Sequence, residues 1–183
     1  MKRWFWLIVA LQLLFLVGEV ATKEIAIARA PTVILKTAPI DPRSLFTGNY
    51  MTLGYDISTV SLSRTTLPAS VRKRLTYGDV VYAKLAVVRP WAKLLDVTTR
   101  RPDKPEPGVV YLKGSFCDRF TPGQFGIEYG LDRYYIPENR TEEVAKLERW
   151  TAKQPVITVE VGVTDSGQGM VKRVFVDGRP LGF

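Results

Sequence analysis

The sequence holds few of the residues that usually carry out chemistry. It has 183 residues, no histidine and a single cysteine, Cys117. Histidine is the commonest general base near neutral pH and the commonest metal ligand, so Ser–His–Asp triads, Cys–His pairs and histidine-based metal sites are excluded within this chain. Cys117 has no second cysteine to pair with, and we expect a buried, unreactive thiol. We expect no cofactor and no metal site.

Carboxylates are the next group with catalytic or cation-binding chemistry. Glu128, Asp132 and Glu138 follow one another within a short segment, and Asp41 lies far ahead of them. Paired carboxylates can transfer protons or bind a hard cation. Their spacing matches no metal-binding loop, so the sequence favours ion pairing with arginines instead. The candidate partners are Arg43, Arg119 and Arg133.

A serine–lysine peptidase site is a further alternative. It needs a serine beside a desolvated lysine. Ser44 is the only serine in a plausible early position, and Lys84 is the only lysine in a plausible apolar strand. The usual Ser-Met or Ser-x-Pro setting is absent, so this is the least favoured interpretation, and we expect that the protein is not an enzyme.

The segment Gly48 to Tyr55, GNYMTLGY, concentrates aromatic residues. Alternate side chains of an extended chain face opposite sides, which divides the segment into two faces. One face has Tyr50, Thr52 and Gly54. The other face has Met51, Leu53 and Tyr55. We expect the second, apolar face to be in the core and Tyr50 to point outward or into a groove, so the segment is either a packed hairpin start or a ligand-facing aromatic strip.

A second aromatic segment spans Tyr129 to Glu138, YGLDRYYIPE. With the GNYMTLGY segment, its turn residues Gly48 and Asn49 and its lead-in Asp41-Pro42-Arg43, it supplies the candidate interaction residues. These are Asp41, Arg43, Gly48, Asn49, Tyr50, Leu53, Tyr55, Tyr129, Gly130, Asp132 and Tyr134.

Hydrophobic alternation predicts the elements that must position these residues. Strands are expected at 33–38, 50–58, 77–88, 109–116, 134–136, 156–163 and 171–176. Tight turns are expected at Asp165-Ser166-Gly167 and at Asp177-Gly178. Asn139 and Glu142 have the spacing of a capping box and predict one helix that reaches Trp150. The fold class is therefore mainly β with a minor α part, a compact antiparallel curved sheet or small barrel with one helix.

The N-terminus carries a membrane signal. Lys2 and Arg3 precede an apolar run over residues 4–18. This pattern predicts a single spanning helix whose basic end stays inside, or else a cleaved signal peptide. We favour the uncleaved helix, which gives an anchor over residues 1–23 and one exported β-rich domain over residues 24–183.

The chain is basic, with a net charge of +8. Its basic residues are scattered, and the two local runs are Arg72-Lys73-Arg74 and Arg100-Arg101 with Lys104. Scattered charge on an exported domain argues against nucleic-acid binding and favours solvated loops. The alternative is attraction of these runs to anionic lipid headgroups.

Three segments together resemble a known family. Gly48, Tyr50, Leu53 and Tyr55 match the bacterial proteins named for a G-D-Y-x-x-L-x-Y motif, with Asn49 in place of the usual aspartate. The segments YGLDRYYIPE and VFVDGRPL resemble that family's later segments, so the resemblance covers nearly all of the exported part. The family is membrane-anchored and functionally uncharacterised. Because Asn49 lacks a titratable carboxylate, a catalytic or metal-binding role for that position is not supported.

The resemblance implies a location and a kind of partner. It implies a single-pass protein of the inner membrane with its C-terminal domain in the periplasm, frequently associated with polytopic membrane proteins. We therefore expect an accessory or interaction domain with an integral membrane protein partner. An envelope ligand- or peptide-binding module is the first alternative, and the signal-peptidase-like enzyme is the second.

Overall fold

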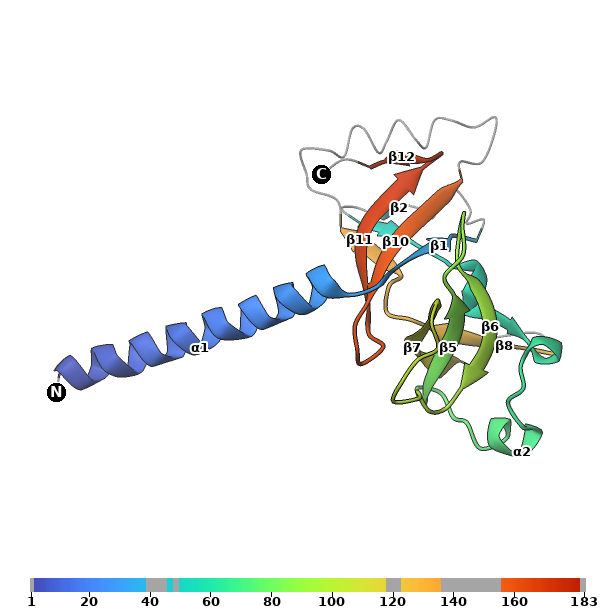
Figure 1. Cartoon of the computed structure of the whole chain (residues 1–183), viewed down its shortest axis with the longest axis horizontal. Helices are drawn as coiled ribbons and strands as arrows, with labels where there is room; N and C mark the ends of the chain where they lie inside the picture. Colours follow the sequence, from blue (N-terminus) through green and yellow to red (C-terminus); the bar gives the residue numbers. More distant parts are fainter. Residues whose placement is uncertain (1, 39–45, 48–49, 118–122, 136–155, 182–183) are drawn as a thin grey trace. The chain divides into compact units, whose positions relative to one another are not determined.

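The structure is a computed structural model that describes residues 2–38, 46–47, 50–117, 123–135 and 156–181. The chain divides into two units, Met1–Ala30 and Pro31–Phe183. In Figure 1 the first is one long helix, and the second consists mainly of β-strands.

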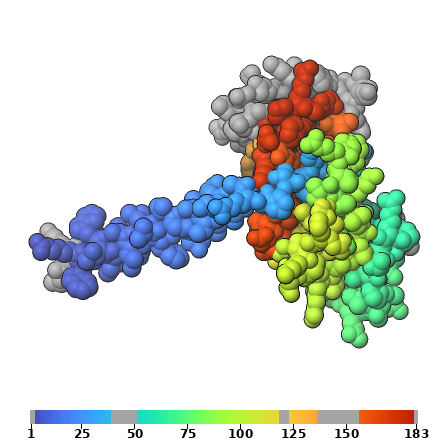
Figure 2. All heavy atoms as spheres, viewed as in Figure 1, coloured from blue at the N-terminus to red at the C-terminus, as the bar shows by residue number. Residues whose placement is uncertain are grey.

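Helix α1, Lys2–Arg29, makes up almost all of the first unit. Its 28 residues give a length of about 42 Å, which exceeds the hydrocarbon thickness of a bilayer, about 30 Å. Its span from Arg3 to Arg29 is long and apolar enough to cross a membrane. The apolar side chains are exposed along the helix (Figure 2). The helix continues beyond residue 23, because the first proline that could end it is Pro31.

The second unit is built from antiparallel strands, which form three sheets within the described residues. The four-stranded sheet has the order β1 (Thr32–Lys36), β10 (Ile157–Val163), β11 (Gly169–Val176) and β12 (Arg179–Pro180). The five-stranded sheet has the order β4 (Thr59–Ser61), β8 (Gln124–Glu128), β7 (Val109–Cys117), β5 (Val80–Ala86) and β6 (Lys93–Thr98). The three-stranded sheet has the order β2 (Phe46–Thr47), β3 (Tyr50–Thr52) and β9 (Arg133–Tyr135). Short helices are α2 (Ala69–Arg72), η2 (Asp56–Ser58) and η3 (Leu62–Arg64).

Hydrophobic alternation decides which side of each strand is buried. Val81, Ala83 and Leu85 of β5 are fully buried, and the residues between them are partly exposed. Strand β10 alternates in the same way from Ile157 to Val161. The buried side chains form a large cluster that draws on β1, β3, β5 and β10 and a smaller one that contains Phe116 and Phe125. Burial of apolar area on this scale is the main stabilising term of the unit.

The mainly antiparallel β fold with an N-terminal apolar helix is confirmed, and its sheets stay open rather than closing into a barrel. The turn at Asp177-Gly178 is also confirmed, with both residues at positive φ of 49° and 78°. Strands β4 and β6 were not predicted, because β4 has only three residues and β6 contains a register irregularity within the sequence KLLDVT. The helix predicted after Asn139 lies outside the described residues.

Candidate functional site

The GNYMTLGY segment forms the centre of the candidate site. Strand β3 pairs on one side with β2 and on the other with β9, and the chain then passes into η2. Met51, Leu53 and Tyr55 are at most 3% exposed, which confirms that this face lies in the core. Thr52 and Gly54 on the opposite face are half-buried. The side chain of Tyr50 lies outside the described residues, so its outward direction stays a prediction.

The fold brings the second aromatic segment against the first. Strand β9 pairs antiparallel with β3, which places Tyr134 opposite Met51. The contact continues beyond the strands, because the backbone N–H of Leu53 donates to the carbonyl of Asp132 at 2.7 Å. Two segments that are far apart in the sequence therefore form one backbone-paired unit.

Two tyrosine hydroxyls form hydrogen bonds between the same two segments. The hydroxyl of Tyr55 donates to the carbonyl of Leu131 at 2.8 Å, and the hydroxyl of Tyr129 donates to the carbonyl of Ile57 at 2.8 Å. Burial raises the pKa of Tyr55, and the charge of Asp132 raises it further. Burial also raises the pKa of Tyr129, whose hydroxyl lies in the interior although its ring is half-buried. Both phenols are therefore neutral donors at physiological pH.

The remaining candidates of the second segment have structural positions. Gly130 adopts a φ of +68°, a conformation that L side chains rarely adopt, and this turns the chain between Tyr129 and Leu131. Asp132 lies 3.7 Å from the guanidinium of its neighbour Arg133, so the expected carboxylate–arginine pairing is present at this position. Burial raises the pKa of Tyr134, which packs against the larger core cluster.

Several predicted residues lie outside the described part of the chain. They are Asp41, Arg43, Ser44, Gly48, Asn49, Arg119 and Glu138. The proposed acidic cluster therefore cannot be assembled from the described residues, which contain no group of three or more potential metal ligands.

The lysine of the serine–lysine alternative has an ionic partner. The ammonium of Lys84 lies 2.8 Å from a carboxylate oxygen of Glu106. The hydrogen bond to Glu106 is the main cause that raises the pKa of Lys84. A lysine that acts as a general base needs a lowered pKa, so this environment favours the wrong protonation state for that chemistry. The predicted burial of Cys117 is confirmed.

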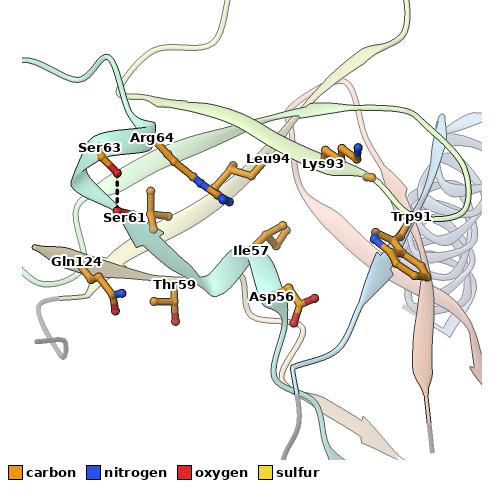
Figure 3. Close-up of a pocket in the computed structure, with 12 residues that line it drawn as sticks. Asp56, Ile57, Thr59, Ser61, Ser63, Arg64, Trp91, Lys93, Leu94 and Gln124 are labelled. Carbon is orange, nitrogen blue, oxygen red and sulfur yellow. Dashed lines mark hydrogen bonds between the residues drawn. The ribbon is translucent and has the colours of Figure 1, made fainter.

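A groove of about 810 Å³ is lined by residues that begin with Asp56, the first residue after the GNYMTLGY segment (Figure 3). Asp56 and Ile57 of η2, strand β4 and Arg64 of η3 line it, together with residues 91–94 at the start of β6. In Figure 3 the side chain of Arg64 extends from the η3 side toward Leu94 on the β6 side. Ligand clefts in proteins commonly have volumes of about 300–1,000 Å³, so the groove is large enough to hold a ligand or a segment of a partner.

The charged groups of the groove are unequally paired. Asp56 lies 3.7 Å from Lys36, whose ammonium also stands 5.2 Å above the ring of Trp91. Arg64 and Lys93 are exposed and have no ion pair within the described residues. The groove therefore carries an excess of positive charge that faces solvent.

The tyrosine contacts connect the GNYMTLGY segment to the groove. The hydroxyl of Tyr129 donates to the carbonyl of Ile57, which lines the groove, and Tyr55 directly precedes Asp56, which lines it too. We did not predict from the sequence that Ile57 and Leu131 accept these bonds, because any residue can supply a backbone carbonyl. The groove was not predicted either, since it depends on β4 and β6. The one available signal was the position of Asp56 immediately after the segment.

Helix and site together define a class of protein, in which one helix of membrane-spanning length precedes an antiparallel β domain whose core contains Leu53 and Tyr55 of the G-x-Y-x-x-L-x-Y segment. The chain matches the family described as GDYXXLXY protein over residues 12–174 and belongs to it. The family membership expected from the three segments is thus confirmed. No curated protein and no solved structure matches the chain.

Proposed function

We propose that this protein is a membrane-anchored interaction domain that acts with a polytopic partner in the inner membrane. Helix α1 holds the protein in the bilayer with its basic N-terminus inside, and the β unit faces the periplasm. The observation that carries the proposal is the open, positively charged groove in a unit that directly follows an apolar helix of spanning length in the sequence. Such a groove offers a binding surface in a unit that the helix tethers to the membrane.

A non-catalytic role is supported by the chemistry of the groove residues. The groove is lined by hydroxyls, an amide, a tryptophan, two cations without an ion pair within the described residues, and one carboxylate, Asp56, which is paired with Lys36. These groups can recognise a ligand, and the single carboxylate has no second carboxylate or nucleophile–base pair beside it in the described lining of the groove. An envelope peptide-binding module is the second candidate function, and the groove volume of about 810 Å³ favours it. The two functions differ in whether the bound segment belongs to a resident membrane protein.

Topology is tested first. A reporter fused after Phe183 is expected to be active only outside the cytoplasm, and the mature protein is expected to retain Trp4 and to remain in the membrane fraction. Intact-mass measurement checks the second point. Activity of the reporter inside the cytoplasm would contradict the proposed orientation, and a mature protein that starts after residue 23 would contradict the anchor.

The partner is tested by purification of the tagged native protein in mild detergent. We expect a polytopic membrane protein to be recovered in a fixed ratio. A matched control keeps the β unit and replaces residues 1–23 with an unrelated spanning helix. Recovery of the partner with this control would show that the β unit makes the contact, whereas its loss would assign the contact to the anchor.

A further inference from the structure

The two edge strands of the five-stranded sheet line the same groove. Every neighbouring pair in the order β4-β8-β7-β5-β6 is antiparallel, so the two edge strands β4 and β6 run in the same direction. Both edge strands also line the groove. A sixth strand that is antiparallel to both edges would complete the alternation and occupy the groove between them.

The register of β4 shows which backbone groups are available. Leu62 donates its N–H to the carbonyl of Gly123, just beyond the β4–β8 pairing. Because hydrogen-bonded pairs alternate in an antiparallel ladder, Val60 is the next residue that bonds to β8. The N–H and C=O groups of Thr59 and Ser61 therefore point toward the open edge, and no bond to the N–H of Ser61 occurs within the described residues.

Among the described residues, backbone donors at the two ends of the outer edge of β6 have partners, and the stretch between them has none. The N–H of Ala92 donates to the carbonyl of Ile34 at 2.7 Å, and the N–H of Val97 donates to the carboxylate of Asp96 at 2.8 Å. Between these bonds, Lys93 and Leu94 line the groove. An unpaired edge of this kind is a template for another strand.

Charge complementarity selects the occupant. Arg64 comes from the segment after β4 and Lys93 from β6, so each side of the groove has one cation without an ion pair in the described part of the chain. The carboxylate of Asp56 is already paired with Lys36. An incoming acidic side chain would meet two cations, whereas a basic one would be repelled.

We propose that an extended, acidic segment of the partner adds a strand between β4 and β6, with its backbone paired to both edges and its carboxylates on Arg64 and Lys93. The inference rests on the proposed function, since it names the chemistry of the segment that the interaction domain binds. Backbone hydrogen bonds supply affinity in this mode of recognition, and side-chain charge supplies selectivity.

The test uses the full chain in detergent micelles and a fluorescent peptide of about seven residues, a usual strand length, in which valine alternates with glutamate. Because backbone pairing tolerates most sequences, this probe needs only strand propensity and negative charge. We expect saturable binding below about 1 mM, and slower hydrogen exchange at the amides of Ser61 and Leu94. A peptide with lysine in place of glutamate is expected to bind at least tenfold more weakly.

Ser61 offers a matched pair of variants. Its φ of −73° is already suited to proline, and its N–H is the outward donor, so Ser61→Pro removes that donor with little strain. Ser61→Ala keeps the donor and removes only the hydroxyl. We expect Ser61→Pro to weaken binding about tenfold and Ser61→Ala to stay within about twofold. Should Ser61→Pro fail to fold, a probe N-methylated at alternate residues loses its donors toward one of the two edges and is expected to lose binding to the unaltered protein.

The charged contacts have their own control. Arg64→Gln combined with Lys93→Gln is expected to weaken glutamate-probe binding about tenfold. Arg100→Gln combined with Lys104→Gln makes the same change in net charge outside the groove and is expected to have little effect. Equal binding of the lysine probe, undiminished binding of the N-methylated probe, or absence of binding by the glutamate probe would each overturn the proposal. If Ser61→Pro recovers the native partner as efficiently as Ser61→Ala does, the interaction domain stands and the added strand does not.

Discussion

Tyr55 and Tyr129 form a reciprocal pair, in which each phenol donates a hydrogen bond to the backbone of the other's segment. Tyr55 bonds to the carbonyl of Leu131, two residues after Tyr129, and Tyr129 bonds to the carbonyl of Ile57, two residues after Tyr55. The two bonds fix both the direction and the register of the segments. The bond from Tyr55 also gives a physical reason for a tyrosine at this position of the GNYMTLGY segment, because phenylalanine would fill the same space but could not donate to Leu131.

Removal of either hydroxyl is expected to destabilise the β unit. Tyr55→Phe and Tyr129→Phe each leave a carbonyl without its donor in a largely buried place, which costs about 1–2 kcal/mol of unfolding free energy. Tyr55→Ala also removes a buried ring and is expected to cost about 3 kcal/mol or more. Chemical denaturation of the full chain in detergent measures all three.

The two hydroxyls are expected to be coupled, because they hold the same pair of segments. The double variant Tyr55→Phe with Tyr129→Phe should cost less than the sum of the single variants by about 0.5 kcal/mol or more, since loss of one bond already loosens the other. Strict additivity would mean that the two bonds act independently.

Alkaline pH is expected to weaken the same contact. Burial raises the pKa of both phenols above the ordinary tyrosine value of about 10, so the native state keeps protons that the unfolded state loses. Above about pH 10 the native state binds more protons than the unfolded state, and the unfolding free energy falls as pH rises. The unfolding free energy, measured by denaturation across this pH range, should fall more steeply with pH for the unaltered chain than for the double phenylalanine variant. Equal slopes would contradict the assigned burial.

Sequence patterns predict this fold well where alternation is long. Strand β10 and the turn after β11 could be predicted from the sequence. The valines of β10 alternate with a period of two, and Asp177-Gly178 is a residue pair that favours a tight turn with positive φ. The core face with Met51 and Tyr55 was readable for the same reason. Nothing local marks Leu131 or Ile57 as acceptors, since the partner tyrosine comes from a remote segment. The groove depends on β4 and β6, whose shortness and irregularity leave no periodic signal.

Gly130 and Gly114 are expected to resist alanine for different reasons. Gly130 has a φ of +68° and open space around its missing side chain, so Gly130→Ala pays only a conformational penalty of about 1–2 kcal/mol. Gly130→Asn should be milder, because asparagine tolerates this conformation. At Gly114 a Cβ would lie 2.4 Å from the side chain of Ile127 and 3.0 Å from the carbonyl of Glu128, so Gly114→Ala must displace the neighbouring strand β8. We expect Gly114→Ala to cost more than Gly130→Ala in denaturation, and the reverse order would contradict these positions.

Lys84→Met is expected to leave the function of the protein unchanged. Its ammonium is engaged by Glu106, which keeps it charged and occupied. Complementation of a deletion strain measures the outcome, and Glu106→Gln is the matched control, because it removes the charge of the partner and keeps the lysine. Loss of function with Lys84→Met but normal thermal unfolding would revive the peptidase alternative.

Asp96 is expected to make the unit sensitive to acid. Burial opposes ionisation of this carboxyl, but hydrogen bonds from the hydroxyl and N–H of Thr66, from the N–H of Val97 and from Thr65 outweigh it and lower the pKa of Asp96. These bonds connect the segment after Arg64 to β6, the strand that contains Leu94.

A lowered native pKa of Asp96 gives stability that is fully present above the ordinary carboxyl pKa of about 3.9 and is lost as pH falls through the lower native value. Asp96→Asn should therefore cost about 1 kcal/mol at neutral pH, a value kept small by partial exposure, and should flatten the loss of stability below about pH 4. Denaturation curves of both proteins from neutral to acid pH decide the point, because an unchanged acid slope in Asp96→Asn would show that another carboxyl is responsible.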